Sequence, residues 1–228
     1  MLAPERLDAA FKAIKPFFQE SPRSSVKPDI SAQKIESAFG ELRSPLAAAK
    51  QNGGLINPWD IVGLKRGEVR NTAALRGLWQ TDFGGEASRQ FLAEYLSSSI
   101  PGYNWPSELQ ARYSVDTEIS PVGDTSDRVD LVIETARHLI GIEVKIDAGL
   151  GPKQLERYIV SIERRAEMHG LKSHVILLAP FESRTPEVIS TSWRDIATAA
   201  SRAARGPAGE RNFIEHFIAT FGAHVSHF

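Results

Sequence analysis

The spacing of hydrophobic positions changes near residue 112, and this change divides the chain into a helical part and a strand-rich part. Before residue 112, apolar residues recur every three or four positions, as they do on one face of a helix. The segments with this spacing are 5–19, 32–50 (where Pro45 can interrupt the helix), 57–80 after an initial turn, and 86–100 after the loop "TDFGG". The N-terminal half is therefore predicted to be helical.

The second half begins with β-rich runs that short polar segments separate. Three strands are predicted at 112–120, 127–134 and 138–146, and a helix at 151–170, with Pro152 in its first turn and Gly170 at its end. The continuous apolar run 174–180 is typical of a strand that is covered on both faces. Two helices, at about 193–205 and 211–221, follow it.

This order of elements predicts an α/β fold: a mixed sheet flanked by helices, with added N-terminal helices. The polar, proline-containing segment 20–29 separates the first helix from the rest. We expect residues 1–56 to form a helical N-terminal elaboration and residues 57–228 to form one compact domain.

Composition adds few restrictions to this picture. The 228 residues are 42% hydrophobic, enough for a core, and the 27 basic and 28 acidic residues nearly balance. Cysteine is absent, which excludes disulfides and thiolate metal sites. The N-terminus carries Glu5 and Asp8 where a signal peptide would be basic and then apolar. No apolar run approaches the roughly 20 residues that span a bilayer, so the expectation is a cytoplasmic protein without a membrane partner.

Candidate chemistry lies in the second and third predicted strands. If their turn centres on Ala136 and Arg137, Asp130 lies opposite Glu143, since both are six residues from the turn. Opposed residues of antiparallel strands point to the same face, and the period of two adds Lys145 to that face. Ala-Arg is not a favoured two-residue turn; a four-residue loop would keep this register, but a three-residue loop would not.

Two carboxylates held so close repel each other unless a hard divalent cation lies between them. Asp130 and Glu143 are therefore candidate ligands for Mg²⁺ or Mn²⁺, with the Val144 backbone carbonyl as a further ligand. Such an ion activates a bound water and polarises a phosphodiester, and Lys145 can orient or deprotonate that water. Hydrolysis of a phosphodiester is the reaction that uses every member of this set.

Asp130, the triplet Glu143-Val144-Lys145, and the helical pair Gln154 and Tyr158 resemble the motifs of the PD-(D/E)XK nuclease superfamily. The resemblance covers roughly Asn57 to Pro180. It implies a restriction-endonuclease-like core of helix, three strands, helix and strand (αβββαβ) within residues 57–228. It also implies catalytic or supporting roles for Gln154 and Tyr158.

One residue departs from the family pattern, and one metal ligand has several candidates. Val129 stands where the proline of the motif would be. By its likeness to one bacterial branch of the superfamily, Glu68 is a candidate third metal ligand, although an acid at a helix N-terminus also stabilises the helix dipole. Glu86 and Glu94 compete with Glu68 for this role.

The resemblance implies nucleic acid as the partner, most simply DNA, and a homodimer, since a duplex has two strands to cut. Arg157, Arg164 and Arg165, on the predicted helix 151–170, are candidate phosphate contacts, although exposed helix cations are common without such a role. Two alternatives stay open. One is a nuclease for RNA or branched structures on the same fold, and the other is a non-catalytic nucleic-acid-binding or defence-system partner on a nuclease scaffold.

Overall fold

The computed structural model describes residues 31–51, 56–119, 129–206 and 210–228, and the chain divides into two compact units, residues 1–56 and 57–228. In the first unit, the described element is helix α2 (Ala32–Gln51), which matches the predicted helix 32–50. Pro45 lies inside α2 and does not end it. The predicted helix 5–19 and the segment 20–29 lie outside the described residues.

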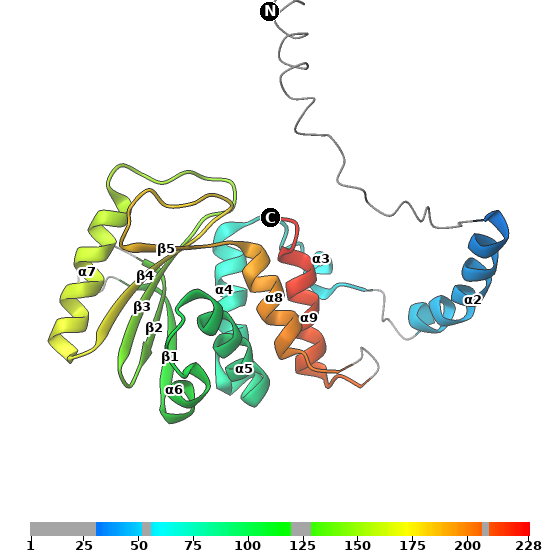
Figure 1. Cartoon of the computed structure of the whole chain (residues 1–228), viewed down its shortest axis with the longest axis horizontal. Coiled ribbons are helices and arrows are strands. Elements are labelled where there is room, and N and C mark those ends of the chain that lie inside the picture. The colour runs from blue at the N-terminus through cyan, green and yellow to red at the C-terminus, as the bar shows by residue number, and fades with distance from the viewer. Residues whose placement is uncertain (1–30, 52–55, 120–128, 207–209) are drawn as a thin grey trace, which may run out of the picture. The chain divides into compact units, whose positions relative to one another are not determined.

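A five-stranded mixed sheet forms the centre of the second unit (Figure 1). Its strands are β1 (Tyr113–Ile119), β2 (Val129–Thr135), β3 (His138–Val144), β4 (Lys172–Leu178) and β5 (Val188–Thr191), in this spatial order. The first three strands are antiparallel, and β3, β4 and β5 run parallel to one another. The predicted mixed sheet is confirmed, and β5 is a fifth strand that the sequence pattern did not indicate.

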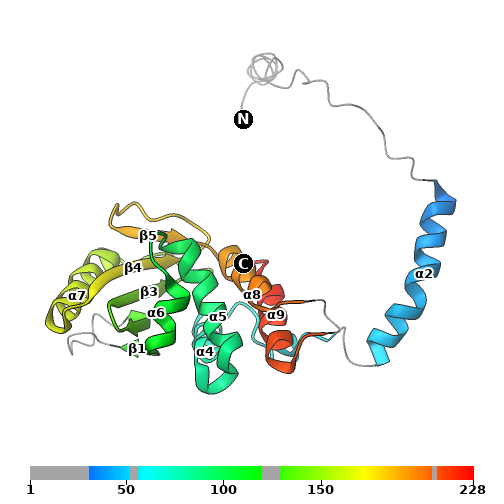
Figure 2. The same cartoon turned by 60° about the horizontal axis from the view of Figure 1, so that its bottom comes forward.

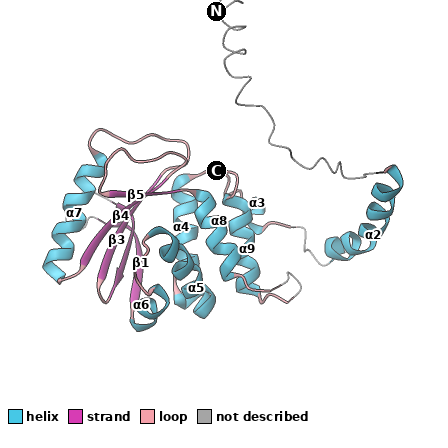
Figure 3. Ribbon diagram, in the orientation of Figure 1, coloured by secondary structure: helices cyan, strands magenta, loops and turns pink. Residues whose placement is uncertain are grey.

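Helices cover both faces of this sheet (Figure 3). The helices of this unit are α3 (Pro58–Ile61), α4 (Glu68–Trp79), α5 (Thr81–Ser99), α6 (Trp105–Ala111), α7 (Gln154–His169), α8 (Trp193–Ala203) and α9 (Phe213–Val225). The views in Figures 1 and 2 both place α7 on one side of the sheet, with α4, α5, α8 and α9 together on the other side.

Alternate side chains of β3 pack into two hydrophobic clusters, one on each face of the sheet. Ile140, Ile142 and Val144 are buried in the larger cluster, with residues of α4, α5, α8 and α9. Leu139 belongs to a second cluster with Leu155 and other apolar residues of α7. Because each buried Leu, Ile or Val side chain contributes about 1.5–3 kcal/mol, the two layers fix which face each β3 residue occupies.

Three segments differ from the prediction. The expected loop "TDFGG" is helical, since α5 begins at Thr81 and bends at Gly85, whose φ is 55°. Helix α6 was not predicted; Asn104 caps it by accepting from the Ser107 N–H. The third strand ends at Val144 rather than 146.

Gly141 of β3 allows α7 to approach the sheet closely. A Cβ atom at this position would lie 2.8 Å from Cδ1 and Cγ1 of Ile162. Gly141→Ala is therefore expected to lower the free energy of unfolding by about 1–3 kcal/mol, the usual cost of overpacking a core. Urea denaturation of Gly149→Ala, where a Cβ meets nothing within 4 Å, provides the control. Equal loss of stability in both variants would contradict the close approach.

Candidate active site

The β2–β3 hairpin sets the geometry of the site. Leu131 pairs with Ile142 and Glu134 with Leu139, so that the register continues to Asp130 opposite Glu143. The predicted register is therefore confirmed. The connection is two residues long, and Thr135 stabilises it, because its Oγ1 accepts from the backbone N–H of His138 at 3.0 Å and of Arg137 at 3.3 Å. Hydrogen bonds to the Thr135 side chain thus stabilise this turn, although Ala-Arg is not a favoured two-residue turn.

Glu143 connects three of the predicted site residues. Its Oε1 lies 2.5 Å from Lys145 Nζ and accepts a hydrogen bond from Gln154 Nε2 at 2.7 Å. Gln154 Nε2 also donates to the Tyr158 hydroxyl at 2.8 Å. Glu143 and Lys145 are 1% and 8% exposed, so that this contact is shielded from water. Gln154 and Tyr158 thus support Glu143 from the first turns of α7.

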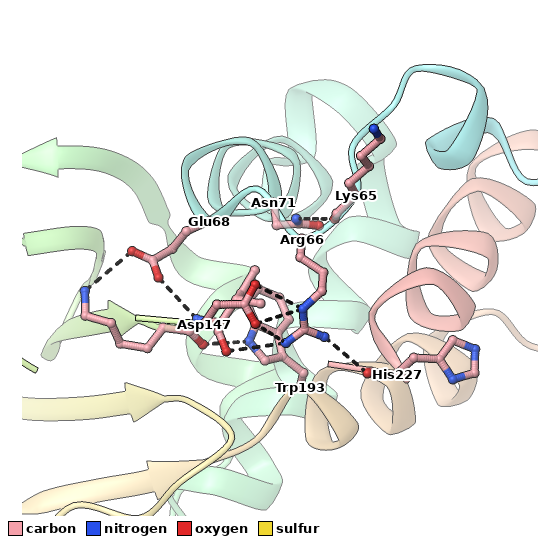
Figure 4. Close-up of polar contacts among 9 residues, drawn as sticks. Lys65, Arg66, Glu68, Asn71, Asp147, Trp193 and His227 are labelled. Atoms are coloured by element: carbon pink, nitrogen blue, oxygen red, sulfur yellow. Dashed lines mark hydrogen bonds and ion pairs between the residues drawn. The ribbon is translucent and has the colours of Figure 1, made fainter. Parts of the chain in front are cut away.

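The two remaining acids approach from other elements. Asp130 Oδ2 accepts from the Val144 N–H at 2.9 Å, which fixes the carboxylate across the hairpin. Glu68, the first residue of α4, lies 3.5 Å from Lys145 Nζ through Oε1 and accepts from the Ile146 N–H through Oε2 at 3.2 Å (Figure 4). Of the three candidates for the third metal ligand, Glu68 contacts this group, whereas Glu86 pairs with Arg89 and Glu94 accepts from Gln90.

Burial and charge shift the ionisation of the group. Burial, together with the charge of Asp130, raises the pKa of Glu143 to about 7. Burial likewise raises the pKa of Asp130. For Lys145, burial lowers the pKa, but the hydrogen bond and the charge of Glu143 outweigh it, and the net pKa is raised. The ammonium is therefore charged at neutral pH, and the two carboxyl groups do not ionise easily together.

A network behind Lys145 holds the turn that follows β3. Arg66 donates from Nε and Nη2 to the Asp147 carboxylate, at 2.9 and 2.7 Å, and from Nη2 to the Ile146 carbonyl at 3.4 Å (Figure 4). Trp193 Nε1 donates to the Lys145 carbonyl at 3.0 Å. The Lys145 carbonyl and the two residues that follow it are thus held by residues distant in the sequence.

This network predicts an effect of Arg66 on activity without contact with the reacting atoms. We expect Arg66→Ala to reduce several-fold the activity that the resemblance implies, because the Ile146 carbonyl and the Asp147 carboxylate lose their guanidinium contacts and Lys145 moves. Activity is compared with that of Arg70→Ala, whose guanidinium donates to the Gly63 carbonyl instead. Circular dichroism shows whether both variants are folded, and equal activity of the two folded variants would show that the network does not position Lys145.

The carboxylates fit a divalent cation. Glu143 Oε2 is buried and has no hydrogen-bond partner, next to the second carboxylate, Asp130. Such an unpaired buried oxygen is costly unless a cation or proton satisfies it, and oxygen ligands are those that Mg²⁺ and Mn²⁺ prefer. Among the described residues, no three His, Asp or Glu side chains already form a complete metal site. An ion at Asp130 and Glu143 would therefore take further ligands from backbone, water or substrate.

A pocket of about 230 Å³ lies beside the site, lined by Glu68, Val69, Thr72, Ala73, Thr117 and Asp130. On α7, Arg165 donates to Glu134 at 2.9 Å, and Arg157 donates to the Pro152 carbonyl at 2.9 Å, while Arg164 is exposed. Two of the three candidate phosphate contacts thus also have contacts within the protein.

The sheet order and the polar group at the ends of β2 and β3 define the class: an α/β domain with acids and a lysine on adjacent strands. Residues 80–221, well over half of the chain, match the PD-(D/E)XK nuclease superfamily, and the chain belongs to this superfamily. The matched region contains Asp130, Glu143, Lys145, Gln154 and Tyr158, but begins after Glu68. Neither the curated proteins nor the solved structures gave a match. Membership suggests a nuclease, a hydrolase that acts on nucleic acid and is typically metal-dependent.

No helix among the described residues is sufficiently long and apolar to span a membrane.

Proposed function

We propose that the unit 57–228 hydrolyses phosphodiester bonds in DNA with the aid of Mg²⁺ or Mn²⁺. The observation that carries the proposal is the convergence of Asp130, Glu143 and Lys145 at the ends of the paired strands β2 and β3. A structural ion pair would not need Asp130, whose charge opposes the ionisation of Glu143. A divalent cation would be bound by both acids, and the lysine would act at the phosphodiester.

Asp130 and Glu143 would hold the ion, with the Val144 carbonyl as a further ligand, and Glu68, which contacts Lys145, would be a third acid beside them. When bound, the ion lowers the pKa of a coordinated water and polarises the scissile phosphate. As a charged ammonium, Lys145 orients the attacking water and offsets negative charge in the transition state, while the proton of the water passes to solvent. Its contacts with Glu143 and Glu68 place the ammonium between the two acids.

Gln154 and Tyr158 have a supporting role in this proposal. The Gln154 amide joins Glu143 to Tyr158, and its Oε1 accepts from the Gly151 N–H at 3.0 Å. Gln154 thus orients the Glu143 carboxylate while Oε2 of the same group is left for the ion. Arg157, Arg164 and Arg165 would contact phosphates along α7.

The test uses purified protein and labelled duplex DNA, single-stranded DNA, RNA and flap substrates, with Mg²⁺ or Mn²⁺ and with excess chelator. Metal-dependent cleavage of DNA is expected. Cleavage of RNA or of flaps alone would keep the chemistry and change the substrate. Nucleic-acid binding without cleavage of any substrate would instead favour a non-catalytic scaffold.

The raised pKa of Glu143 predicts that metal affinity depends on pH. Below pH 7 the carboxyl is protonated in the metal-free protein, and a cation must displace this proton. Affinity for Mn²⁺, measured by calorimetry, is therefore expected to fall about tenfold per pH unit below pH 7 and to level off above it. The control is thermal unfolding at each pH, which confirms that the protein stays folded. Constant affinity between pH 6 and 8 would contradict a protonated Glu143.

A further inference from the structure

Helix α2 carries an apolar stripe that the nuclease function does not use. Ile35, Phe39, Leu42 and Leu46 are 44%, 63%, 48% and 49% exposed, and α2 has no buried residue. Their spacing of four, three and four residues is that of the a and d positions of a heptad repeat. Ala32 and Ala49 extend the same spacing at both ends. The stripe therefore runs along one side of the whole helix.

A helix of 20 residues with such a stripe gains little stability by itself. Isolated helices are marginal in water, and most helix stability in proteins comes from packing an apolar face. A contiguous row of exposed large apolar side chains is typical of a contact surface. The a and d spacing indicates that the partner is another helix.

The stripe is complementary to itself when two copies run antiparallel. An axis of two-fold symmetry between Gly40 and Glu41 pairs residues whose numbers add to 81. Phe39 then faces Leu42, and Ile35 faces Leu46, so that each large side chain meets another large one. Ala32 faces Ala49, so that small side chains meet at both ends of the interface. Such a symmetric contact closes as a dimer.

Charge on the flank of the stripe favours the same orientation. Glu36 and Arg43 lie one heptad apart on one side, and together with Ile35 and Phe39 they line a groove along α2. In the antiparallel pair, Glu36 of each copy comes next to Arg43 of the other. In a parallel pair Glu36 and Arg43 would instead face Ser31 and Ala38, which carry no charge. Only the antiparallel arrangement pairs opposite charges.

We propose that α2 forms an antiparallel two-helix interface with α2 of a second copy of this chain. This interface makes the protein a homodimer through the unit 1–56, independently of the site in the unit 57–228. Because the dimer carries two sites, it is suited to act at two positions of one nucleic acid.

Introduced cysteines test the arrangement directly, since the natural sequence has none. Ile35→Cys and Leu46→Cys are prepared as separate full-length proteins and oxidised alone or mixed. The antiparallel pair places position 35 of one copy against position 46 of the other, within reach of a disulfide. A disulfide-linked dimer is therefore expected in the mixture, and little or none in either protein alone. Dimers formed by the single proteins alone would show a parallel pair, and absence of dimers from the mixture would overturn the proposal.

A charge exchange provides a second measurement by sedimentation equilibrium. Glu36→Arg or Arg43→Glu alone is expected to weaken the dimer about tenfold or more, because like charges then meet, and the double variant is expected to restore it. Ser44→Glu, on the side away from the stripe, is the matched control and leaves the dimer unchanged. A protein that remains monomeric at all concentrations would overturn the proposal. Equal weakening by the double variant and the single variants would also contradict the antiparallel pairing.

Discussion

Lys145→Ala is expected to reduce DNA cleavage by roughly 10²–10⁴-fold, the range for the loss of a positioned acid–base or charge-stabilising group. The Lys145 ammonium lies between Glu143 Oε1 and Glu68 Oε1, at 2.5 and 3.5 Å. Alanine removes the cation that contacts both acids, and neither carboxylate can replace it at a phosphate. Single-turnover cleavage of a labelled duplex at saturating Mg²⁺ measures the loss of the chemical step.

Lys172→Ala serves as the matched control. Lys172 lies at the opposite end of the β3–β4 pair, where its ammonium is 5.2 Å from the centre of the Tyr103 ring. Its loss is expected to leave the cleavage rate within about twofold, since surface substitutions have small effects. If Lys145→Ala, correctly folded, cleaved DNA as fast as Lys172→Ala, the proposed role of Lys145 would be wrong.

The hairpin register could be predicted because it depends on counting alone. Once Ala136 and Arg137 are taken as the turn, Asp130 must face Glu143, and the alternation of apolar residues fixes which face carries the acids. The same alternation places Ile142, Val144 and Ile146 on the opposite face, and all three are buried in one cluster. Local periodicity and strand pairing thus determined the centre of the site.

Other features depend on contacts between segments that are distant in the sequence, which no local pattern predicts. Strand β5 is four residues long, too short for alternation to distinguish it from a loop, and it forms because β4 offers a parallel edge. The bond between Arg66 and Asp147 joins residues 81 positions apart, and each alone is an ordinary surface charge. The place of Glu68 among three candidate acids likewise required the position of α4 against the end of β3.

The contact between His138 and His174 also could not be predicted from the sequence. The sequence gives them no ligand spacing, yet parallel pairing of β3 and β4 brings His138 Nδ1 within 3.0 Å of His174 Nε2. Burial, together with the neighbouring His138 and Lys172, lowers the pKa of His174 to about 4. The pair therefore stays neutral at physiological pH and acts as a packed hydrogen bond at the end of the sheet away from the site.

Asp130→Asn is expected to reduce cleavage strongly and at the same time to stabilise the metal-free protein. Asparagine keeps the size of the side chain and an oxygen that can accept from the Val144 N–H. It removes a charge that is disfavoured in the folded protein, where burial raises the pKa of Asp130. Loss of one of two carboxylate ligands is expected to lower Mn²⁺ affinity at least tenfold and activity by about 10³-fold.

The sign of the stability change follows from linkage. An acid whose pKa is higher in the folded than in the unfolded state opposes folding above its unfolded pKa, near 4, and has no such cost below it. The melting temperature of Asp130→Asn without metal is therefore expected to exceed that of the unaltered protein at pH 8, with the difference shrinking as the pH approaches 4. Asp116→Asn, whose aspartate pairs with Arg76 on the surface at 3.6 Å, is the matched control and leaves cleavage intact. A folded Asp130→Asn protein that is less stable than the unaltered protein at pH 8 would show that this carboxylate is a structural ion-pair partner, whereas gain of stability with loss of activity indicates that it is held in place for a cation.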